Sequence, residues 1–288
     1  MSKSNTLSII GRFAPSPTGA LHLGSLYTAL ASYLQAKSQQ GQWRLRIDDL
    51  DTPRNVKGAV SDILNTLETF GLHWDGKVVY QSQCLDIYQQ ALHELQQKQQ
   101  IYACACSRKD LETTACTCRN KFIRPDTLHA LRIKTDEQTI CFNDNLQGLV
   151  SQVLHDDFVL KRKDNIIAYQ FAVVLDDYQQ GVNQVVRGFD LLYETPKQIY
   201  LQQLLKLSSP DYFHVPVIVD AQGYKLSKQT RATAVNSNTP EQVIFNLLKL
   251  LKQQPPKELN TANVFEQLNW AVKNWKIEQL KNVQQVNI

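Results

Sequence analysis

The stretch that decides the fold is residues 7–47, LSIIGRFAPSPTGALHLGSLYTALASYLQAKSQQGQWRLRI. Residues 7–13 form a short apolar run that predicts a buried strand, and the prolines and glycine of residues 15–19 end it. Leucines then recur at spacings near three and four within residues 21–39, which predicts a helix, and residues 43–47 alternate as a strand does. A strand, a helix and a second strand in this order predict a parallel sheet of the α/β class.

Periodicity and short apolar runs predict the other elements of the chain. The predicted helices are residues 56–70, 84–97 and 194–207, and the predicted strands are residues 158–160, 168–175 and 212–219. Two more helices are expected near the C-terminus. The first begins at Thr239, with Pro240 at the first helical position and Gln242 placed to close a capping box, and the second spans residues 261–275.

The change of pattern along the chain predicts four segments. Residues 1–103 and 158–234 are expected to form the two halves of one domain with a Rossmann-like parallel sheet. Residues 104–157 are irregular, polar and rich in cysteine, so we expect a small insertion there. Residues 235–288 are expected to form a helical C-terminal subdomain.

The composition is that of a globular protein and excludes several classes. Of 288 residues, 43% are hydrophobic and 20% are charged, which excludes fibrous and wholly disordered proteins. No apolar run approaches about 18 residues and residues 1–6 lack the plan of a signal peptide, so we expect no membrane span and a cytoplasmic protein. The 31 Lys and Arg against 27 Asp and Glu give a charge of +4, which permits a nucleic-acid partner without indicating one.

The turn between the first strand and the first helix, residues 11–25, is a candidate phosphate site. A helix N-terminus presents free N–H groups and a partial positive charge, and ligands of open α/β sheets lie beyond the carboxyl ends of the strands. Gly24 would let a ligand approach the backbone, and His22 could donate to phosphate oxygens. The alternative is that the prolines only shape a turn and that His22 is a surface histidine.

A second candidate site is the polar loop that carries Lys225, Ser227 and Lys228. Two lysines that flank a serine could clamp a phosphoryl group during transfer, because each ammonium is a compact charge with rotatable donors. Taken alone, such a pair is more typical of solvated loop charges.

Together the two sites resemble the paired signatures of the class I aminoacyl-tRNA synthetases. HLGS at residues 22–25 is similar to the family form HIGH, and KLSKQ at residues 225–229 is similar to KMSKS. RFAPSPTG at residues 12–19 and RIDDLDTPR at residues 46–54 resemble the glutamyl branch of that class. About fifty residues follow Ala234, too few for the large helical anticodon-binding region of a glutamyl-tRNA synthetase. The chain therefore resembles the shorter glutamyl-queuosine tRNA(Asp) synthetase family.

The resemblance implies an activity and its partners. That family activates L-glutamate with ATP and attaches it to the queuosine base in the anticodon of tRNA(Asp), without charging the 3′ end. The glutamate carboxylate would attack the α-phosphorus of ATP in line, so that catalysis rests on positioning and on charge stabilisation. Mg²⁺ would accompany ATP, and neither DNA nor a membrane is an expected partner.

The resemblance also implies roles for individual residues. The expected catalytic groups are His22 and Lys228. The implied ATP site comprises His22, Gly24, Ser25, Lys225, Ser227 and Lys228. The implied glutamate site comprises Arg12, Ala14, Ser16, Asp48, Tyr169 and Arg187. A buried arginine pair would reject glutamine, because the neutral amide matches cationic donors poorly.

Two of these positions depart from the family pattern, and two have a plain alternative. Asp48 stands where the discriminating enzymes usually carry Glu, and Ser25 replaces the second histidine of the first signature. Without the resemblance, Tyr169 reads as a strand residue with its ring in the core, and Arg187 as a partner of Asp190.

Four of the six cysteines, Cys104, Cys106, Cys116 and Cys118, lie within 15 positions. In a cytosolic chain such clustering indicates a metal rather than disulfides, and four thiolates match the ligand count of one structural Zn²⁺. The resembled family has a zinc site of Cys-x-Cys followed by Tyr and Cys, and we expect Cys116 as the fourth ligand. The alternative is a set of free thiols. The remaining two, Cys84 and Cys141, are expected to be ordinary buried cysteines.

Three other functions remain open from the sequence. The first is a short enzyme that charges tRNA(Glu), and the second is a small-molecule adenylyltransferase or amide ligase on the same fold. The third is a tRNA-binding module without catalysis, which the presence of both signatures disfavours.

Overall fold

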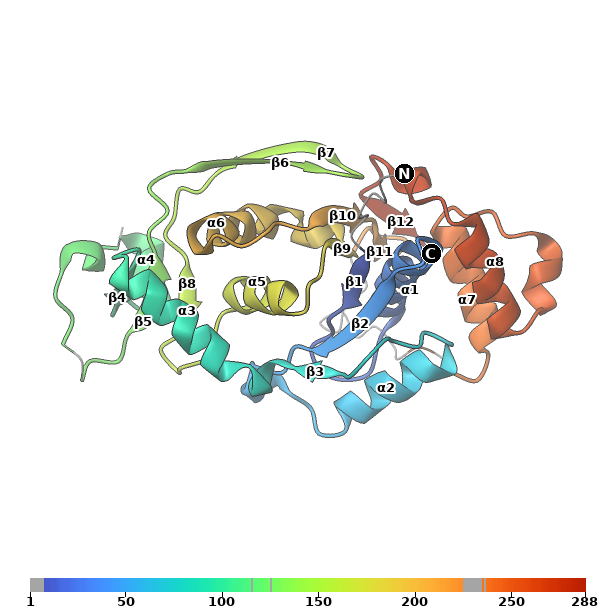
Figure 1. Cartoon of the computed structure of the whole chain (residues 1–288), viewed down its shortest axis with the longest axis horizontal. Coiled ribbons are helices and arrows are strands. Elements are labelled where there is room, and N and C mark those ends of the chain that lie inside the picture. The colour runs from blue at the N-terminus through green and yellow to red at the C-terminus, as the bar shows by residue number, and fades with distance from the viewer. Residues whose placement is uncertain (1–7, 115, 125, 225–234, 236) are drawn as a thin grey trace, which may run out of the picture.

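The computed structural model describes residues 8–114, 116–124, 126–224, 235 and 237–288. A parallel sheet lies at its centre (Figure 1). Strand β2 (Gln42–Ile47) lies between β1 (Ile10–Phe13) and β3 (Val79–Tyr80) and is parallel to both. The register places Ile10 opposite Gln42. The α/β class and its parallel sheet are confirmed.

The sheet continues beyond β1. Strand β9 (Gln184–Gly188) pairs in parallel with β10 (Asp211–Val215). Asn183, just before β9, is tied to β1 in both directions, since Ile10 N–H donates to Asn183 Oδ1 at 2.8 Å and Asn183 N–H donates to the Ile10 carbonyl at 3.0 Å. The carboxyl ends of β1, β2 and β9 therefore open on the same side of the molecule.

Helices cover both faces of this sheet. On one face, α1 (Leu23–Ser38) and α2 (Ala59–Thr69) share a core with β1 and β2 that includes Leu30, Trp43 and Ile63. Parallel strands need such a crossover helix, and α1 supplies it between β1 and β2.

On the other face, α3 (Leu85–Gln97), α5 (Tyr169–Gln179) and α6 (Thr195–Leu205) form a second core. Val185 of β9 belongs to this second core and Val186 belongs to the first. That alternation follows from the two-residue period of a strand.

The segment predicted as an insertion contains antiparallel strands and one short helix, α4 (Arg108–Thr113). Strand β5 (Ala130–Ile133) pairs with β4 (Ile101–Cys104) and with β8 (Val159–Lys161). Strands β6 (Thr139–Asp144) and β7 (Gly148–Val153) form a hairpin, which crosses the top of Figure 1 toward β10.

The C-terminal part is mainly helical, as expected. Helices α7 (Pro240–Leu250) and α8 (Val264–Asn274) extend the core of α1 and lie beside it (Figure 1). Strand β12 (Gln285–Asn287) pairs in parallel with β11 (Val217–Val219), so the last residues return to the sheet region. Among the described residues, no helix is both long and apolar enough to cross a lipid bilayer.

Three local predictions are wrong. Residues 168–175 are predicted as a strand, but they lie at the start of helix α5. Residues 171–177 of this helix are all buried, because α3 and α6 pack around it, and most of them are apolar. A short apolar run does not distinguish a buried helix from a buried strand. The strand predicted for residues 212–219 is split between β10 and β11 by Pro216, which has no N–H to donate. Cys141 is exposed rather than buried.

Other local predictions hold in part. Helix α7 begins with Pro240 as predicted, but the Thr239 side chain makes no capping hydrogen bond. The capping box lies instead at α8, between Asn263 and Glu266. Cys84 is half-buried.

Candidate active site

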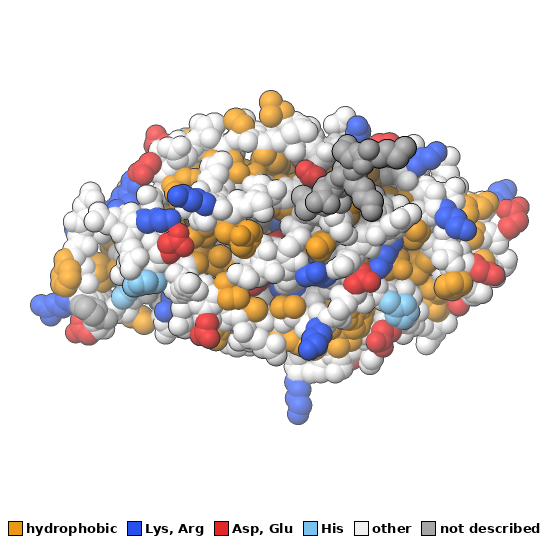
Figure 2. Space-filling view, in the orientation of Figure 1, with side chains coloured by type: hydrophobic (Ala, Val, Ile, Leu, Met, Phe, Trp, Pro, Cys, Tyr) orange, Lys and Arg blue, Asp and Glu red, His pale blue; other side chains and the backbone are white. Residues whose placement is uncertain are grey.

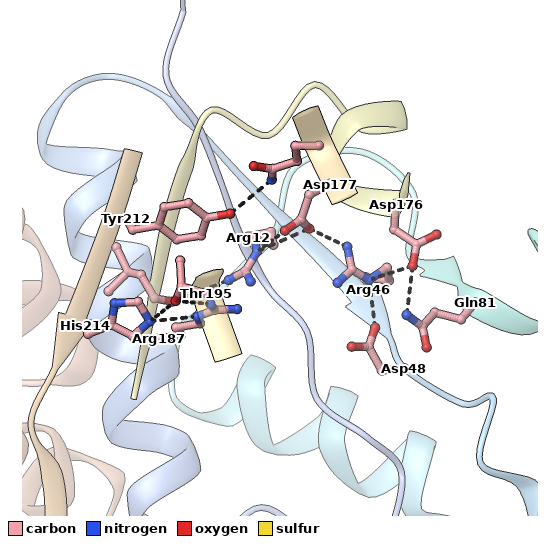
Figure 3. Close-up of polar contacts among 12 residues, drawn as sticks. Arg12, Arg46, Asp48, Gln81, Asp176, Asp177, Arg187, Thr195, Tyr212 and His214 are labelled. Carbon is pink, nitrogen blue, oxygen red and sulfur yellow. Dashed lines mark hydrogen bonds and ion pairs between the residues drawn. The ribbon is translucent and has the colours of Figure 1, made fainter. Parts of the chain in front are cut away.

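Arg46 is the centre of a buried ionic network at the carboxyl ends of β1 and β2 (Figure 3). Its side chain is fully buried, and Nε donates to Asp48 Oδ1 at 2.7 Å while Nη1 donates to Asp177 Oδ1 at 2.6 Å. Asp176 Oδ2 lies 3.7 Å from the same Nε. One guanidinium therefore pairs with carboxylates from the residue that follows β2 and from α5.

Arg12 joins this network from β1. Its Nε lies 3.3 Å from both carboxylate oxygens of Asp177, and Nη1 donates to the Val186 carbonyl at 3.4 Å. Burial alone would raise the pKa of Asp177, but the guanidinium groups of Arg12 and Arg46 outweigh it and hold that pKa below its usual range. Asp177 is thus ionised near neutral pH and fixes both arginines.

Asp176 is the carboxylate of this network that lies farther from Arg46 than its neighbour Asp177 does. Burial raises the pKa of this carboxyl to about 6, although Arg46 and hydrogen bonds from Tyr88 Oη at 2.7 Å and Gln81 Nε2 at 2.8 Å act in the opposite direction. Adjacent residues of one helix therefore have pKa values shifted in opposite directions.

Arg187 is held by a separate set of contacts at the end of β9 (Figure 3). Its Nε donates to His214 Nε2 at 3.0 Å and its Nη2 donates to Thr195 Oγ1 at 2.7 Å. His214 Nδ1 lies 2.6 Å from Asp144 Oδ2 at the end of β6. Burial lowers the pKa of His214 to about 4 despite this carboxylate, so the imidazole is neutral near pH 7.

A cavity of about 640 Å³ lies between these arginines and the N-terminus of α1. Eight of the predicted ATP- and glutamate-site residues line it: Arg12, Ala14, Ser16, His22, Gly24, Ser25, Tyr169 and Arg187. The structure therefore brings together residues that lie far apart in the sequence. The cavity joins cationic groups to a helix N-terminus, which is a suitable environment for anions.

His22 is the N-cap of α1 and lines this cavity. Its Nδ1 accepts from the Ser25 backbone N–H at 3.3 Å, and its Nε2 lies 2.9 Å from Ser25 Oγ. Ser25, in the place of the second signature histidine, thus orients the first imidazole.

At the start of the same turn, a Cβ at Gly11 would lie 3.2 Å from Ala36 Cβ, so glycine lets β1 approach α1 closely.

Asp48 opens onto a neighbouring cavity of about 940 Å³ rather than onto the first one. Burial raises the pKa of its carboxyl even though Arg46 lowers it. Ser16, Arg54 and Tyr169 line both cavities, so the two adjoin. The larger cavity is lined by basic and acidic side chains. Asp51 pairs with Arg54 and Arg162, and Asp164 pairs with Arg162, whereas Arg132 and Lys163 lie there without a carboxylate in an ion pair among the described residues.

The plain alternatives for Tyr169 and Arg187 do not hold. Tyr169 begins a helix, is 38% exposed and lines both cavities instead of lying in the core. Arg187 makes its hydrogen bonds to His214 and Thr195. The predicted residues Lys225, Ser227 and Lys228 lie outside the described part of the chain.

The four clustered cysteines form a site that could hold a metal ion. Within the described part of the chain, Cys104, Cys106, Cys116 and Cys118 are the one group of His, Cys, Asp or Glu so arranged, with all four Sγ atoms within 4.8 Å of one another. Neighbouring Sγ atoms are 3.5 to 3.9 Å apart, close to the ~3.8 Å spacing of four sulfurs bound tetrahedrally at about 2.3 Å. The donor set fits a tetrahedral metal.

Sequence reasoning missed the groups that hold the predicted arginines, namely Arg46, Asp144, Asp176, Asp177, Thr195 and His214. The pair of adjacent aspartates in an apolar run was the available signal, because such charges are buried only when paired. His214 and Asp144 are 70 positions apart, and nothing in their neighbourhoods indicates that they meet.

Basic and acidic side chains are interspersed on the face of the described residues that Figure 2 shows, in keeping with the small net charge. Charge patterning of this surface does not identify the partner. Comparison with known proteins identifies the family. The family model "tRNA synthetases class I (E and Q), catalytic domain" matches residues 8–285. The chain belongs to this family. The predicted enzyme class, a class I synthetase-type ligase, is confirmed.

Curated relatives of this synthetase agree along nearly the whole chain. A protein of Aromatoleum aromaticum named glutamyl-Q tRNA(Asp) synthetase is 45% identical over 281 residues, which cover 93% of this chain and 89% of the relative. A protein of Neisseria meningitidis with the same name is 47% identical over 281 residues, covering 92% and 95%.

Solved structures of the class share the fold. A glutamate tRNA ligase from Elizabethkingia meningosepticum, in complex with its amino acid, matches with a TM-score of 0.80 over 96% of this chain. The matched region is 66% of that ligase, and the sequences are 23% identical. At this identity the likeness supports the architecture of the synthetase rather than its substrates.

The buried His214 predicts a specific dependence of stability on pH. Asp144, Asp190 and Arg187 are the charged groups that act on it. Between pH 6.5 and about 4 the unfolded chain takes up a proton at His214 that the folded chain does not, so the folded state loses stability as pH falls through this window.

We expect the free energy of unfolding of the wild type, relative to His214→Gln, to fall by up to about 3 kcal/mol between pH 7 and pH 4. Urea denaturation of both proteins across this range measures the difference. A difference that stays constant with pH would show that the pKa of His214 is not lowered in the folded protein.

Proposed function

We propose that this synthetase activates L-glutamate with ATP to form glutamyl-adenylate and transfers the glutamyl group to queuosine in the anticodon of tRNA(Asp). The observation that carries the proposal is the convergence of two buried guanidinium groups, Arg12 and Arg187, on the cavity that the N-terminus of α1 also lines. The names of the curated relatives supply the same acid and the same RNA.

The glutamate part of the proposal rests on the charge of the cavity. Arg12 and Arg187 are both at most 4% exposed. A guanidinium N–H donates a charge-assisted hydrogen bond to a carboxylate, and a neutral amide would leave these buried cationic donors poorly paired. The cavity therefore favours glutamate over glutamine. Ala14 and Ser16 complete its wall, and Asp48 with Tyr169 would receive the α-ammonium where the two cavities adjoin.

The ATP part rests on the N-terminus of α1. His22, Gly24 and Ser25 would contact the phosphates, as would Lys225, Ser227 and Lys228, with His22 and Lys228 stabilising the charge on the α-phosphoryl oxygens in the transition state. Mg²⁺ bound to ATP would neutralise the leaving pyrophosphate. The glutamate carboxylate is the nucleophile, so the protein supplies position and charge.

The RNA part rests on the larger cavity. It adjoins the proposed adenylate site. Two of its basic side chains, Arg132 and Lys163, donate to backbone carbonyls rather than to carboxylates, so their charge can act on a phosphate backbone. Leu50, Leu128 and Ile167 supply an apolar wall in the same cavity, against which a nucleobase could pack. The acceptor would thus reach the activated carboxyl past Ser16 and Tyr169. An enzyme with these substrates works in the cytoplasm, where ATP and tRNA are present.

For the four-cysteine site we propose one structural Zn²⁺ per chain. Zn²⁺ favours four thiolates in a tetrahedral arrangement, which the Sγ separations match. Cys116 is the best prepared ligand: burial raises the pKa of its thiol, but hydrogen bonds from the Cys118 backbone and from Tyr102 outweigh it and lower that pKa to about 7. The ion would tie β4 to the turn at Cys118.

The function is tested by ATP–pyrophosphate exchange without tRNA, followed by transfer of radiolabelled glutamate. We expect exchange with glutamate and not with glutamine, and labelling of tRNA(Asp) that carries queuosine. Unmodified tRNA(Asp) and tRNA(Glu) are the controls. Labelling of tRNA(Glu) alone would identify a tRNA(Glu)-charging enzyme, and exchange driven by another acid and not by glutamate would identify a different adenylyltransferase.

His22→Asn tests the proposed catalytic histidine. Asparagine is a good N-cap, so the variant keeps the helix start while it loses the imidazole. We expect the exchange rate to fall about 100-fold or more, with a melting temperature near that of the wild type. A rate within about twofold of the wild type would contradict a role for His22 in catalysis.

Cys104→Ser tests the metal site. Metal analysis of the wild type should give close to one zinc per chain, and the variant should lose it, because three thiolates and a hydroxyl bind Zn²⁺ more weakly. Cys141→Ser, at an exposed cysteine outside the cluster, is the matched control and should keep the metal. Full zinc occupancy in Cys104→Ser would remove Cys104 from the ligand set.

A further inference from the structure

Two of the three nitrogens of the Arg187 guanidinium are hydrogen-bonded to protein groups, which leaves the third, Nη1, to donate to a ligand. Nε and Nη2 donate to His214 and Thr195, and the guanidinium carbon lies 5.4 Å from the centre of the Tyr212 ring. Nη1 is buried and has no hydrogen-bond partner among the described residues. Because Arg187 lines the smaller cavity, Nη1 is the donor left for a substrate there.

The contact with Arg187 determines the tautomer of His214. Arginine carries only donors, so His214 Nε2 must accept from Arg187 Nε, and the ring proton must be on Nδ1. Nδ1 lies 2.6 Å from Asp144 Oδ2, which accepts that hydrogen bond. The other neutral tautomer would set an Nε2–H group against the N–H of Arg187.

Asp144 is in turn held by the tip of the β6–β7 hairpin. Its Oδ1 accepts from the backbone N–H groups of Leu146 and Gln147 at 3.0 and 2.9 Å. Asn145 N–H donates to the Tyr212 carbonyl at 2.9 Å, which docks the tip on β10. The carboxylate, the imidazole and the guanidinium thus form a continuous buried chain from the hairpin to the cavity.

We propose that Asp144 and His214 are positioning residues that fix Arg187 to receive the acidic group of the substrate. The inference rests on the proposed function, in which Arg187 meets glutamate. Asp144 selects the tautomer of His214, and His214 then presents a lone pair that holds the guanidinium in one orientation. A donor held in this way has less freedom to lose when the carboxylate binds.

Asp144→Asn is the direct test. The substituted side chain keeps an oxygen for the backbone N–H groups, but its amide nitrogen donates toward His214 Nδ1 and so transfers the ring proton to Nε2, against Arg187. We expect the KM for glutamate in ATP–pyrophosphate exchange to rise at least about tenfold, while kcat and the KM for ATP stay within about threefold. Nitrogen-15 NMR of labelled histidine should show the proton on Nδ1 in the wild type and on Nε2 in the variant.

Two further variants separate positioning from simple loss of structure. His214→Gln supplies a carbonyl acceptor that has no tautomers, so adding Asp144→Asn to it should change the KM for glutamate by less than about twofold. Cys141→Ala lies on the same strand with an exposed side chain and should leave that KM within about twofold of the wild type.

A wild-type ring protonated on Nε2 overturns the inference, and so does a variant that moves the proton without raising the KM for glutamate. If Asp144→Asn fails to fold, His214→Gln and His214→Leu decide it, because only the leucine variant should raise that KM at least about tenfold. A wild type without glutamate-dependent exchange overturns the proposed function instead. In that case the tautomer of His214, which is measured without substrate, would still test whether Asp144 and His214 hold Arg187 as proposed.

Discussion

Arg46 is a guanidinium with no exposed surface, and it survives in the core because three carboxylates surround it. Two of these carboxylates are consecutive on α5 and the third follows β2, so the ion pairs lock a helix against the strand end where the site opens. Arg12, on the neighbouring strand, shares Asp177 with Arg46. The predicted ligand-binding arginine is therefore placed by a partner that lines neither cavity.

This arrangement makes the site depend on a complete network. A buried ion pair contributes little when it is whole, because desolvation offsets the attraction, but loss of one partner costs about 3–5 kcal/mol. Asp177 serves two arginines, and its removal would take away the carboxylate that pairs with Arg12 and one of the three around Arg46. The rigidity that this imposes suits an enzyme whose catalysis rests on position, since misplacement of a reacting group by an ångström can cost a factor of about 100.

The resemblance to a known family predicted most of the residues that face the cavity, and it did not predict those that hold them. Prolines, glycines and a helix start predicted a binding turn after β1, and the clustering of four cysteines predicted a metal site. Asp144 and His214 meet only because a hairpin crosses to β10, and pairings over such distances leave no local pattern. The same limit explains α5, because its short apolar run is compatible with a strand or a helix and the helices that enclose it come from elsewhere in the chain.

The β6–β7 hairpin has a consequence for how this fold can be altered. Besides docking on β10, its tip reaches the chain's last segment, since Gln147 Nε2 donates to the carbonyls of His214 and Val283. The segment of residues 104–157, which the sequence predicts to be an insertion, is thus hydrogen-bonded both to β10 beside the cavity and to the C-terminal residues. Grafting that segment onto a related scaffold, or trimming it, would disturb chemistry about which its own residues give no hint.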